Sequence, residues 1–498
     1  MPLSSISALQ PTCSTSAVDP LDRTAVSLKL DYVRNIPADS PSAPTVQPGP
    51  TVSSTGPSCS DQELENALAR WEPSLENLMR IRASEPRLGQ HLEEVRNILA
   101  ASKAPVSSSS LGPLTFPGSH EHRMSALFPT LNSDARRAAV NSLNGTFESS
   151  LERLENGLLA LAYKLDVWEG DAQTDEQRQV MEKISNRLIA AWRREEQLPG
   201  SPYDPARAGP GLDLSGLRSG SLPMLDTDFS HLQWLDLRNM GLDAQQLAGF
   251  LPQFQGLVRL DLSANQLTQL PSGLQEMRNL KNLDLSANQL QWHQGLFEPL
   301  NGLPITRLGL SGNPLALSGE GIEALAQLQS LRQLDMRSAG LELNDADWRQ
   351  LALIEWGTLD LRDNRIVLSE VGAAAFSPMT RMSRLLLANN PLGRSPQMAN
   401  MRGLHFLELT NTGLTEWPEG LTALLQQTPM SLRQVHLRHN PIEEVPSLAG
   451  SAFANVARTQ QAPMLQIDDS ALSEQSRSHL RQINVAPMSG NGQGGGRA

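Results

Sequence analysis

A short pattern repeated between Leu235 and Leu472 constrains this chain more than any other feature of its sequence. In each copy an apolar residue, any residue and a second apolar residue precede two free positions, an Asn, another free position, and Leu or Ile. Copies begin every 22 to 30 residues, at Leu235, Leu260, Leu283, Leu308, Leu334, Leu359, Leu385, Leu407, Val435 and Leu465. So regular a period predicts a stack of similar coils, because no single coil can bury its own apolar face.

The pattern also predicts the structure of each coil. The apolar-any-apolar run predicts a short strand whose side chains alternate between the interior and an outer, concave face. The Asn follows the strand, where its side chain can hydrogen-bond backbone groups of neighbouring coils. The predicted ladder comprises Asn265, Asn288, Asn313, Asn364, Asn390 and Asn440. Other residues replace the Asn at Met240, Ala339, Thr412 and Ser470, and we expect local irregularity there.

This period and this pattern are the leucine-rich-repeat signature. They predict an α/β fold, a leucine-rich-repeat solenoid with a curved parallel sheet, an N-terminal α-helical cap and disordered termini. The repeats are expected over residues 211–472 as about ten coils plus a degenerate first coil around Leu212 to Leu217.

An α-helical hairpin is predicted over residues 132–199. Leucines recur every three or four residues after Phe147, which is typical of one face of a helix. Thr174 and Gln177 form a capping-box pattern that begins a second helix, and Trp168 and Trp192 are expected in the core of the pair. We expect this hairpin to shield the first coil of the solenoid, whose end would otherwise expose apolar surface.

The remaining segments are predicted from composition. Residues 1–59 are rich in Ser, Thr and Pro and are expected to be disordered, either as a plain tail or as a secretion signal. A short helical segment is expected over 60–102, a linker over 103–131, a C-terminal helix over 473–484 and a disordered Gly-rich tail over 485–498.

Charge and hydropathy argue against several classes of partner. The net charge is -12 and the pI is about 5.3, so we expect no nucleic-acid partner, which would favour a basic patch. No apolar run approaches 18 residues, so no membrane span is expected, and the N-terminus lacks the layout of a secretory signal peptide.

We expect no catalytic, cofactor-binding or metal-binding residues. The two cysteines, Cys13 and Cys59, fall in the predicted tail, whereas a nucleophilic thiolate needs an ordered electropositive pocket. His120 and His122 are too few for a structural metal site, which takes four ligands.

The outward positions of the strands are the remaining candidate site. They comprise Trp234, Asp236, Arg238, Arg259, Asp261, Asp284, Arg307, Asp335, Arg337, Asp360, Arg362, Arg384, Phe406, Glu408, His436 and Arg438. One interpretation is a lattice of Asp–Arg pairs between strands that only solvates the face and contributes little stability. The other is a protein-binding surface with Trp234 and Phe406 as apolar anchors and the arginines as donors.

Several short motifs resemble those of a known family. They are Ala190 to Arg194, Leu212 to Leu217, Leu222-Pro223, Asp228 to His231, Asn390 to Gly393, Thr412 to Pro418 and His439 to Ile442. Through them the chain resembles bacterial leucine-rich-repeat type III effectors delivered into host cells, in particular the Pseudomonas-type members of the "novel E3 ligase" class.

The resemblance implies that the repeats select a host protein, while a separate C-terminal domain would carry a catalytic cysteine. This chain has no cysteine after Cys59, so no ligase residue can be carried over. The expected function is therefore protein recognition by an effector secreted into the host cytoplasm. The alternatives are the recognition part of a ligase whose catalytic domain is missing or truncated, and a scaffold resident in the bacterial cytoplasm. The oligomeric state is left open.

Overall fold

The computed structural model describes residues 119–195, 209–457, 465–483 and 485 of the chain. They fall into two compact units, the first ending at Leu232 and the second beginning at Gln233. The predicted N-terminal tail, the helical segment 60–102, residues 103–118 of the linker and residues 486–498 lie outside the described residues. No described helix is both long and apolar enough to cross a bilayer.

The first unit consists mainly of helices with polar N-caps. Its elements are α5 (His120–Leu127), α6 (Ser133–Asn141), α7 (Phe147–Glu169), α8 (Asp175–Trp192) and strand β1 (Gly211–Asp213). Side chains at the four N-caps each accept a hydrogen bond from a backbone N–H three residues later, which satisfies one free donor of each helix. These N-caps are Ser119, Asn132, Thr146 and Thr174.

Helices α7 and α8 pack against each other, as the leucine spacing predicts. Trp168 and Trp192 are both buried, and Phe128 stacks on Trp192 with ring centroids 5.8 Å apart. The predicted linker is therefore wrong for residues 120–127, because α5 packs on α7. Only half of the predicted capping box forms. The Thr174 side chain accepts the backbone N–H of Gln177, but the Gln177 side chain accepts the backbone N–H of Gln173 and not that of Thr174.

The hairpin is fastened to the segment that follows it within the first unit. Arg187 donates to the carbonyl oxygen of Asp213 at 2.5 Å, and Trp168 donates through Nε1 to Ser221 at 3.0 Å. Asp213 accepts the backbone N–H of Ser215 at 2.8 Å, a turn that recurs in the coils of the second unit. A degenerate coil is predicted at this place.

The second unit is a parallel sheet with one short strand per coil. Its strands are β2 (Trp234–Asp236), β3 (Arg259–Asp261), β4 (Asn282–Asp284), β5 (Arg307–Gly309), β6 (Gln333–Asp335), β7 (Thr358–Asp360), β8 (Arg384–Leu386), β9 (Phe406–Glu408), β10 (Gln434–His436) and β11 (Leu465–Gln466). They pair in sequence order, and the buried middle residues align, as Leu235 does with Leu260. This confirms the predicted α/β leucine-rich-repeat solenoid.

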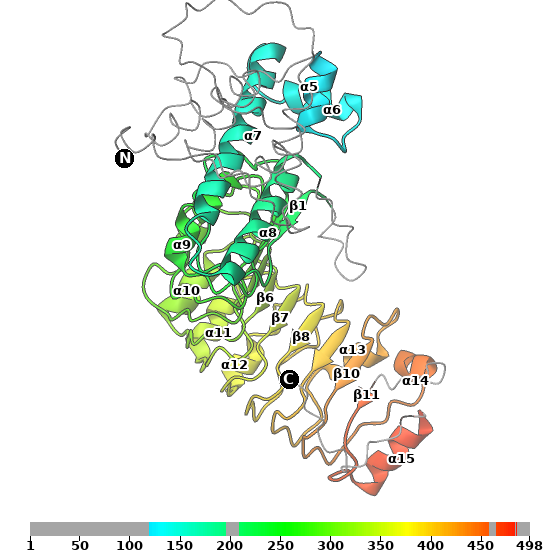
Figure 1. The fold of residues 1–498 in the computed structure, drawn as a ribbon. Coiled ribbons are helices and arrows are strands. Elements are labelled where there is room, and N and C mark those ends of the chain that lie inside the picture. The colour runs from blue at the N-terminus through cyan, green and yellow to red at the C-terminus, as the bar shows by residue number, and fades with distance from the viewer. Residues whose placement is uncertain (1–118, 196–208, 458–464, 484, 486–498) are drawn as a thin grey trace, which may run out of the picture. The chain divides into compact units, whose positions relative to one another are not determined.

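The return path of each coil is a short helix or an irregular turn. The helices are α9 (Ala244–Ala248), α10 (Glu320–Ala326), α11 (Asp345–Leu351), α12 (Glu370–Ala374), α13 (Leu421–Gln426) and α14 (Ala452–Ala457), with 3₁₀ turns η4 (Leu251–Gln253), η5 (Leu274–Glu276) and η6 (Glu298–Leu300). Helices α10 to α12 lie on the side of the coils away from β6 to β8 (Figure 1).

The last described helix is α15 (Glu474–Gln482), in the range where a C-terminal helix is predicted. Ser473 caps it by accepting the backbone N–H of Ser476, and Leu480 and Ile483 are buried. The interior between sheet and returns is apolar, and its largest buried side chains include Trp348 and Phe376, whose ring centroids are 4.7 Å apart.

Candidate functional site: the concave face of the sheet

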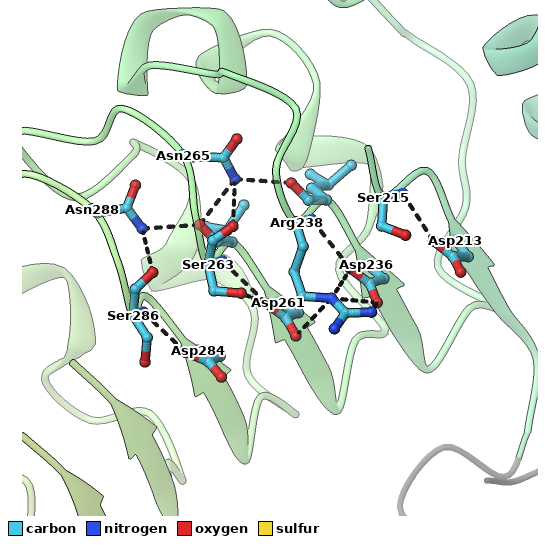
Figure 2. Close-up of polar contacts among 12 residues, drawn as sticks. Asp213, Ser215, Asp236, Arg238, Asp261, Ser263, Asn265, Asp284, Ser286 and Asn288 are labelled. Atoms are coloured by element: carbon cyan, nitrogen blue, oxygen red, sulfur yellow. Dashed lines mark hydrogen bonds and ion pairs between the residues drawn. The ribbon is translucent and has the colours of Figure 1, made fainter. Parts of the chain in front are cut away.

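A ladder of buried asparagines joins each coil to the one before it. The Oδ1 of Asn364 accepts the backbone N–H groups of Ala339 and Leu341 at 3.0 Å, and its Nδ2 donates to the carbonyls of Met336 and Leu361 at 2.9 Å. Asn265, Asn288, Asn313, Asn390 and Asn440 are also buried and likewise bond the backbone of their own and the preceding coil. Figure 2 shows Asn265 and Asn288 at the strand ends.

Most interruptions of the ladder leave the turn unchanged. The residues before Met240, Ala339 and Thr412 are left-handed, with φ between 53° and 56°, which matches the turns that contain Asn. The hydroxyl of Thr412 donates to the carbonyl of Leu409 at 2.8 Å, in place of an amide. The expected irregularity is wrong at these three residues, because the next coil supplies the Asn oxygen that accepts their N–H groups. At Ser470 the preceding residue is not left-handed, so this turn does differ.

The acidic column in the middle of the concave face serves the backbone. In each strand of the second unit that ends in Asp or Glu, the carboxylate accepts the backbone N–H two residues later, at 3.0–3.3 Å. The carboxylates are those of Asp236, Asp261, Asp284, Asp335, Asp360 and Glu408 (Figure 2 shows the first three). Sequence reasoning missed this role, although Asp is known to form such a turn with its own backbone.

Several residues predicted to bind a partner are buried. Asp236 is 2% exposed, Asp261 4% and Asp360 7%, because each carboxylate folds onto the strand end. Trp234 is 2% exposed, as the hydrophobic effect favours for so large a ring, so it is no exposed anchor. The prediction of a contact surface is therefore wrong for these four residues.

The predicted Asp–Arg pairs form mainly within one coil, between the last residue of a strand and the arginine two positions later. Arg362 donates to both carboxylate oxygens of Asp360, at 2.8 and 2.6 Å. Arg238 pairs in the same way with Asp236 and more distantly with Asp261, at 3.5 Å. Residues two apart in a strand share a face, so such a pair needs no neighbouring strand. Arg362 is therefore held by Asp360, and its removal is expected to cost on the order of 1 kcal/mol.

Burial raises the pKa of Asp261 to about 6, and the neighbouring carboxylates of Asp284 and Asp236 add to this rise. Burial also raises the pKa of Asp335. The cause is physical in both cases, since a row of carboxylates in a partly dry surface favours the uncharged form. The surroundings of Asp261 and Asp335 therefore favour the protonated form of these two carboxyl groups.

Asp261→Asn is expected to stabilise the chain by about 1–2 kcal/mol at pH 7 and to flatten its pH dependence. The pKa of Asp261 in the folded chain lies above its ordinary 3.8, so the folded state binds the proton more tightly. The fold is therefore stabilised as the pH falls through 6 and loses that stability as the pH rises. Urea melts between pH 4 and 7 measure this, with Asp363→Asn at an exposed carboxylate as the control. Equal pH slopes for parent and Asp261→Asn would contradict it.

Phe406, Glu408 and His436 form a cluster near the C-terminal end of the concave face. The Nδ1 of His436 lies 2.6 Å from Glu408, and its ring meets that of Phe406 edge-on with centroids 5.1 Å apart. Burial acts to raise the pKa of Glu408, but hydrogen bonds from His436 and Thr410 outweigh it and lower the pKa. Phe406 is half-buried, so part of this predicted anchor stays accessible.

A groove of about 520 Å³ crosses strands β3 to β8 on the concave face. Gly309 interrupts the acidic column at its centre, and a Cβ there would lie 2.6 Å from the Oδ1 of Asp284. Gly309 thus leaves the Asp284 carboxylate room, a role that sequence reasoning missed although it is the one glycine in that column. Arg307 and Arg384 are exposed in the groove, and Arg259 is half-buried there.

The two remaining predicted arginines contact polar groups of the same face. The Nε of Arg337 donates to Ser311 at 3.4 Å, and the Nε of Arg438 donates to Asp468 at 3.3 Å. Among the described residues no cluster of three or more His, Cys, Asp or Glu side chains is placed to hold a metal ion.

Comparison with known proteins finds relatives that match part of the chain. No family model matches the chain. Human podocan-like protein 1 is 30% identical over 242 residues, which cover 46% of this chain and 42% of that protein, so the match spans less than half of that relative. Among solved structures, internalin C2 of Listeria monocytogenes is 27% identical over 40% of this chain and 80% of its own, with a TM-score of 0.31.

A leucine-rich-repeat protein of Leptospira interrogans is similar over 60% of this chain and 86% of its own, at 19% identity and a TM-score of 0.40. The assignment of the fold does not depend on these likenesses. It rests on the repeated sequence pattern, the parallel strands in sequence order and the buried asparagine ladder. By these features the chain has the leucine-rich-repeat fold.

Proposed function

We propose that this chain binds a protein partner through the concave face of its sheet. The groove over β3 to β8 carries the proposal, because the described residues leave it open and line it with arginine, polar and apolar side chains. Arginine and aromatic side chains contribute most to many protein interfaces, and here exposed Arg384 lies over the ring of Phe406. The Arg362–Asp360 pair and the carboxylates of Asp284 and Asp335, bonded to the backbone, hold the shape of the groove, so a partner meets a preformed surface.

A pair of substitutions that fill the groove tests this proposal. Gln333→Tyr with Thr358→Tyr adds two rings to the groove, whereas Leu353→Tyr with Val367→Tyr adds the same rings at side chains already 75% and 59% exposed elsewhere. Proteins captured by the full chain from lysates of candidate host cells are expected to be lost from the groove variant and kept by the control. Capture of the same proteins by both variants would refute binding at this face.

We further propose that the chain acts as an exported bacterial effector inside a host cell. The motifs shared with leucine-rich-repeat effectors and the Ser-, Thr- and Pro-rich composition of residues 1–59 support this. In this proposal the chain recognises its partner and does not modify it, since its two cysteines both precede the helices and repeats.

Export is tested with residues 1–59 fused to a reporter enzyme. Delivery into host cells is expected through a type III secretion system and is expected to cease in a strain that lacks the secretion ATPase. A fusion of residues 132–190, of similar length but helical pattern, serves as the matched control. Equal transfer of the two fusions would favour a protein resident in the bacterium.

A further inference from the structure

Arg307 and Arg384 are exposed arginines of the groove, and each is in contact with an uncharged side chain. Arg307 donates through Nε to Gln333 at 2.7 Å, and Arg384 lies with its guanidinium carbon 5.1 Å from the centre of the Phe406 ring. Neither has a carboxylate of the described residues within 4.0 Å, whereas Arg238 and Arg362 do. Both are exposed, so each presents an uncompensated cation held by a neutral neighbour.

The spacing of these two arginines fits an extended chain. They are the first residues of β5 and β8, which are three strands apart. Neighbouring strands lie about 4.8 Å apart, so the arginine backbones are separated by about 14 Å. An extended segment rises about 3.3 Å per residue, so its residues i and i+4 lie about 13 Å apart on one face. In a helix the same two residues would be only about 6 Å apart.

The surface between the two arginines is polar and uncharged. Gln333 and Thr358 are the first residues of the two intervening strands, and both line the groove. Beyond this row, at the ends of β4 and β6, lie the carboxylates of Asp284 and Asp335, already engaged by backbone N–H groups. These carboxylates repel an acidic segment that strays from the arginine row, which fixes its path across the strands.

We propose that the groove binds an extended segment of the partner protein whose acidic side chains, four residues apart, pair with Arg307 and Arg384. This inference rests on the proposed function and names the chemistry of its partner. The planar guanidinium group matches a carboxylate with two parallel hydrogen bonds. Gln333 and Phe406 already restrain the two side chains, so less conformational freedom is lost when the segment binds.

Peptide selection tests the proposal with a defined probe. A displayed library of random twelve-residue peptides is selected in parallel on the full chain, on Arg307→Gln with Arg384→Gln, and on Arg365→Gln with Arg381→Gln. The last pair removes the same charge from side chains that are 77% and 69% exposed and lie outside the groove. The parent and the control are expected to enrich Asp or Glu at positions four apart, and the groove variant is expected to lose that enrichment.

A synthetic peptide carrying the enriched pattern is then titrated against each variant. Each single groove substitution is expected to weaken binding about tenfold, and Gln at either acidic position of the peptide should do the same. Thermal melts equal to the parent show that the variants fold, since both arginines are exposed.

The outcomes separate this inference from the proposed function. The inference would be overturned if the parent enriched Lys or Arg, enriched peptides without charge preference, or failed to enrich an acidic pair. It would also be overturned if the groove variant still enriched the acidic pair. If the peptides enriched in such a case bound the parent but not the variant Gln333→Tyr with Thr358→Tyr, binding at the concave face would stand. If they bound that variant as well as the parent, the proposed function would fail too.

Discussion

Arg123→Met is expected to lower the free energy of unfolding of the helical unit by about 3–5 kcal/mol. Arg123 in α5 pairs with Glu155 in α7 through two bonds, Nε to Oε1 at 2.8 Å and Nη2 to Oε2 at 2.9 Å. Glu155 is 0% exposed, so the substitution takes the cation that makes two hydrogen bonds to it away from a fully buried carboxylate. The pair also fixes α5 to α7, together with the bond from Arg123 to Glu148.

The double substitution Arg123→Met with Glu155→Leu is the control. Replacing both members of a buried ion pair by apolar residues is often neutral, so this variant is expected to melt close to the parent. Urea melts followed by helical circular dichroism distinguish the three proteins. If the single and double variants were equally destabilised, loss of packing would explain the result and loss of the cation beside Glu155 would not.

Asn364→Ala is expected to lower the stability of the solenoid by about 3 kcal/mol. The substitution leaves two backbone N–H groups and the Met336 carbonyl of the preceding coil without this partner in a buried position, whereas the Leu361 carbonyl keeps its bond from Asn390. Stability in a stack of repeats is approximately a sum over neighbouring coils, so the weakened coil should also broaden the unfolding transition.

The adjacent substitution Arg365→Ala provides the matched control. Its side chain is 77% exposed and pairs with Glu342 at 3.2 Å, also at the surface, so the change is expected to stay within about 0.5 kcal/mol. Urea melts followed by tryptophan fluorescence compare the two variants with the parent. An Asn364→Ala melt that coincides with that of Arg365→Ala would show that the ladder contributes little.

The coil architecture was predictable from sequence because its cause is local and repeated. The apolar positions of each copy set the strand register, so Leu260 aligns with Leu283 as the pattern requires. Helix α5 was missed because its apolar residues, Met124 and Leu127, are few and follow a segment rich in Ser, Pro and Gly. Ser119 at its N-cap was the available signal.

The candidate site was predictable only as a set of positions. The alternation of side chains along a strand places Asp261 and Arg362 on the concave face. It does not predict which side chain extends into solvent and which bonds to its own coil. That choice depends on the nearest unpaired group, which for Asp261 is the backbone N–H of Ser263. Likewise Arg362 and Arg384 occupy outward positions, yet of the two only Arg362 has an acidic residue two positions earlier in the chain, Asp360, with which it pairs.

The engagement of the acidic column with the backbone has a consequence for how such a surface can evolve. Where the third residue of a strand is Asp or Glu it holds the turn, so a change there costs stability whatever the partner. The first residue of a strand does not hold the turn. From β5 to β9 it already differs from strand to strand, as Arg307, Gln333, Thr358, Arg384 and Phe406. A lineage of such chains can therefore acquire new partners by mutation at one position per coil while inheriting the scaffold intact.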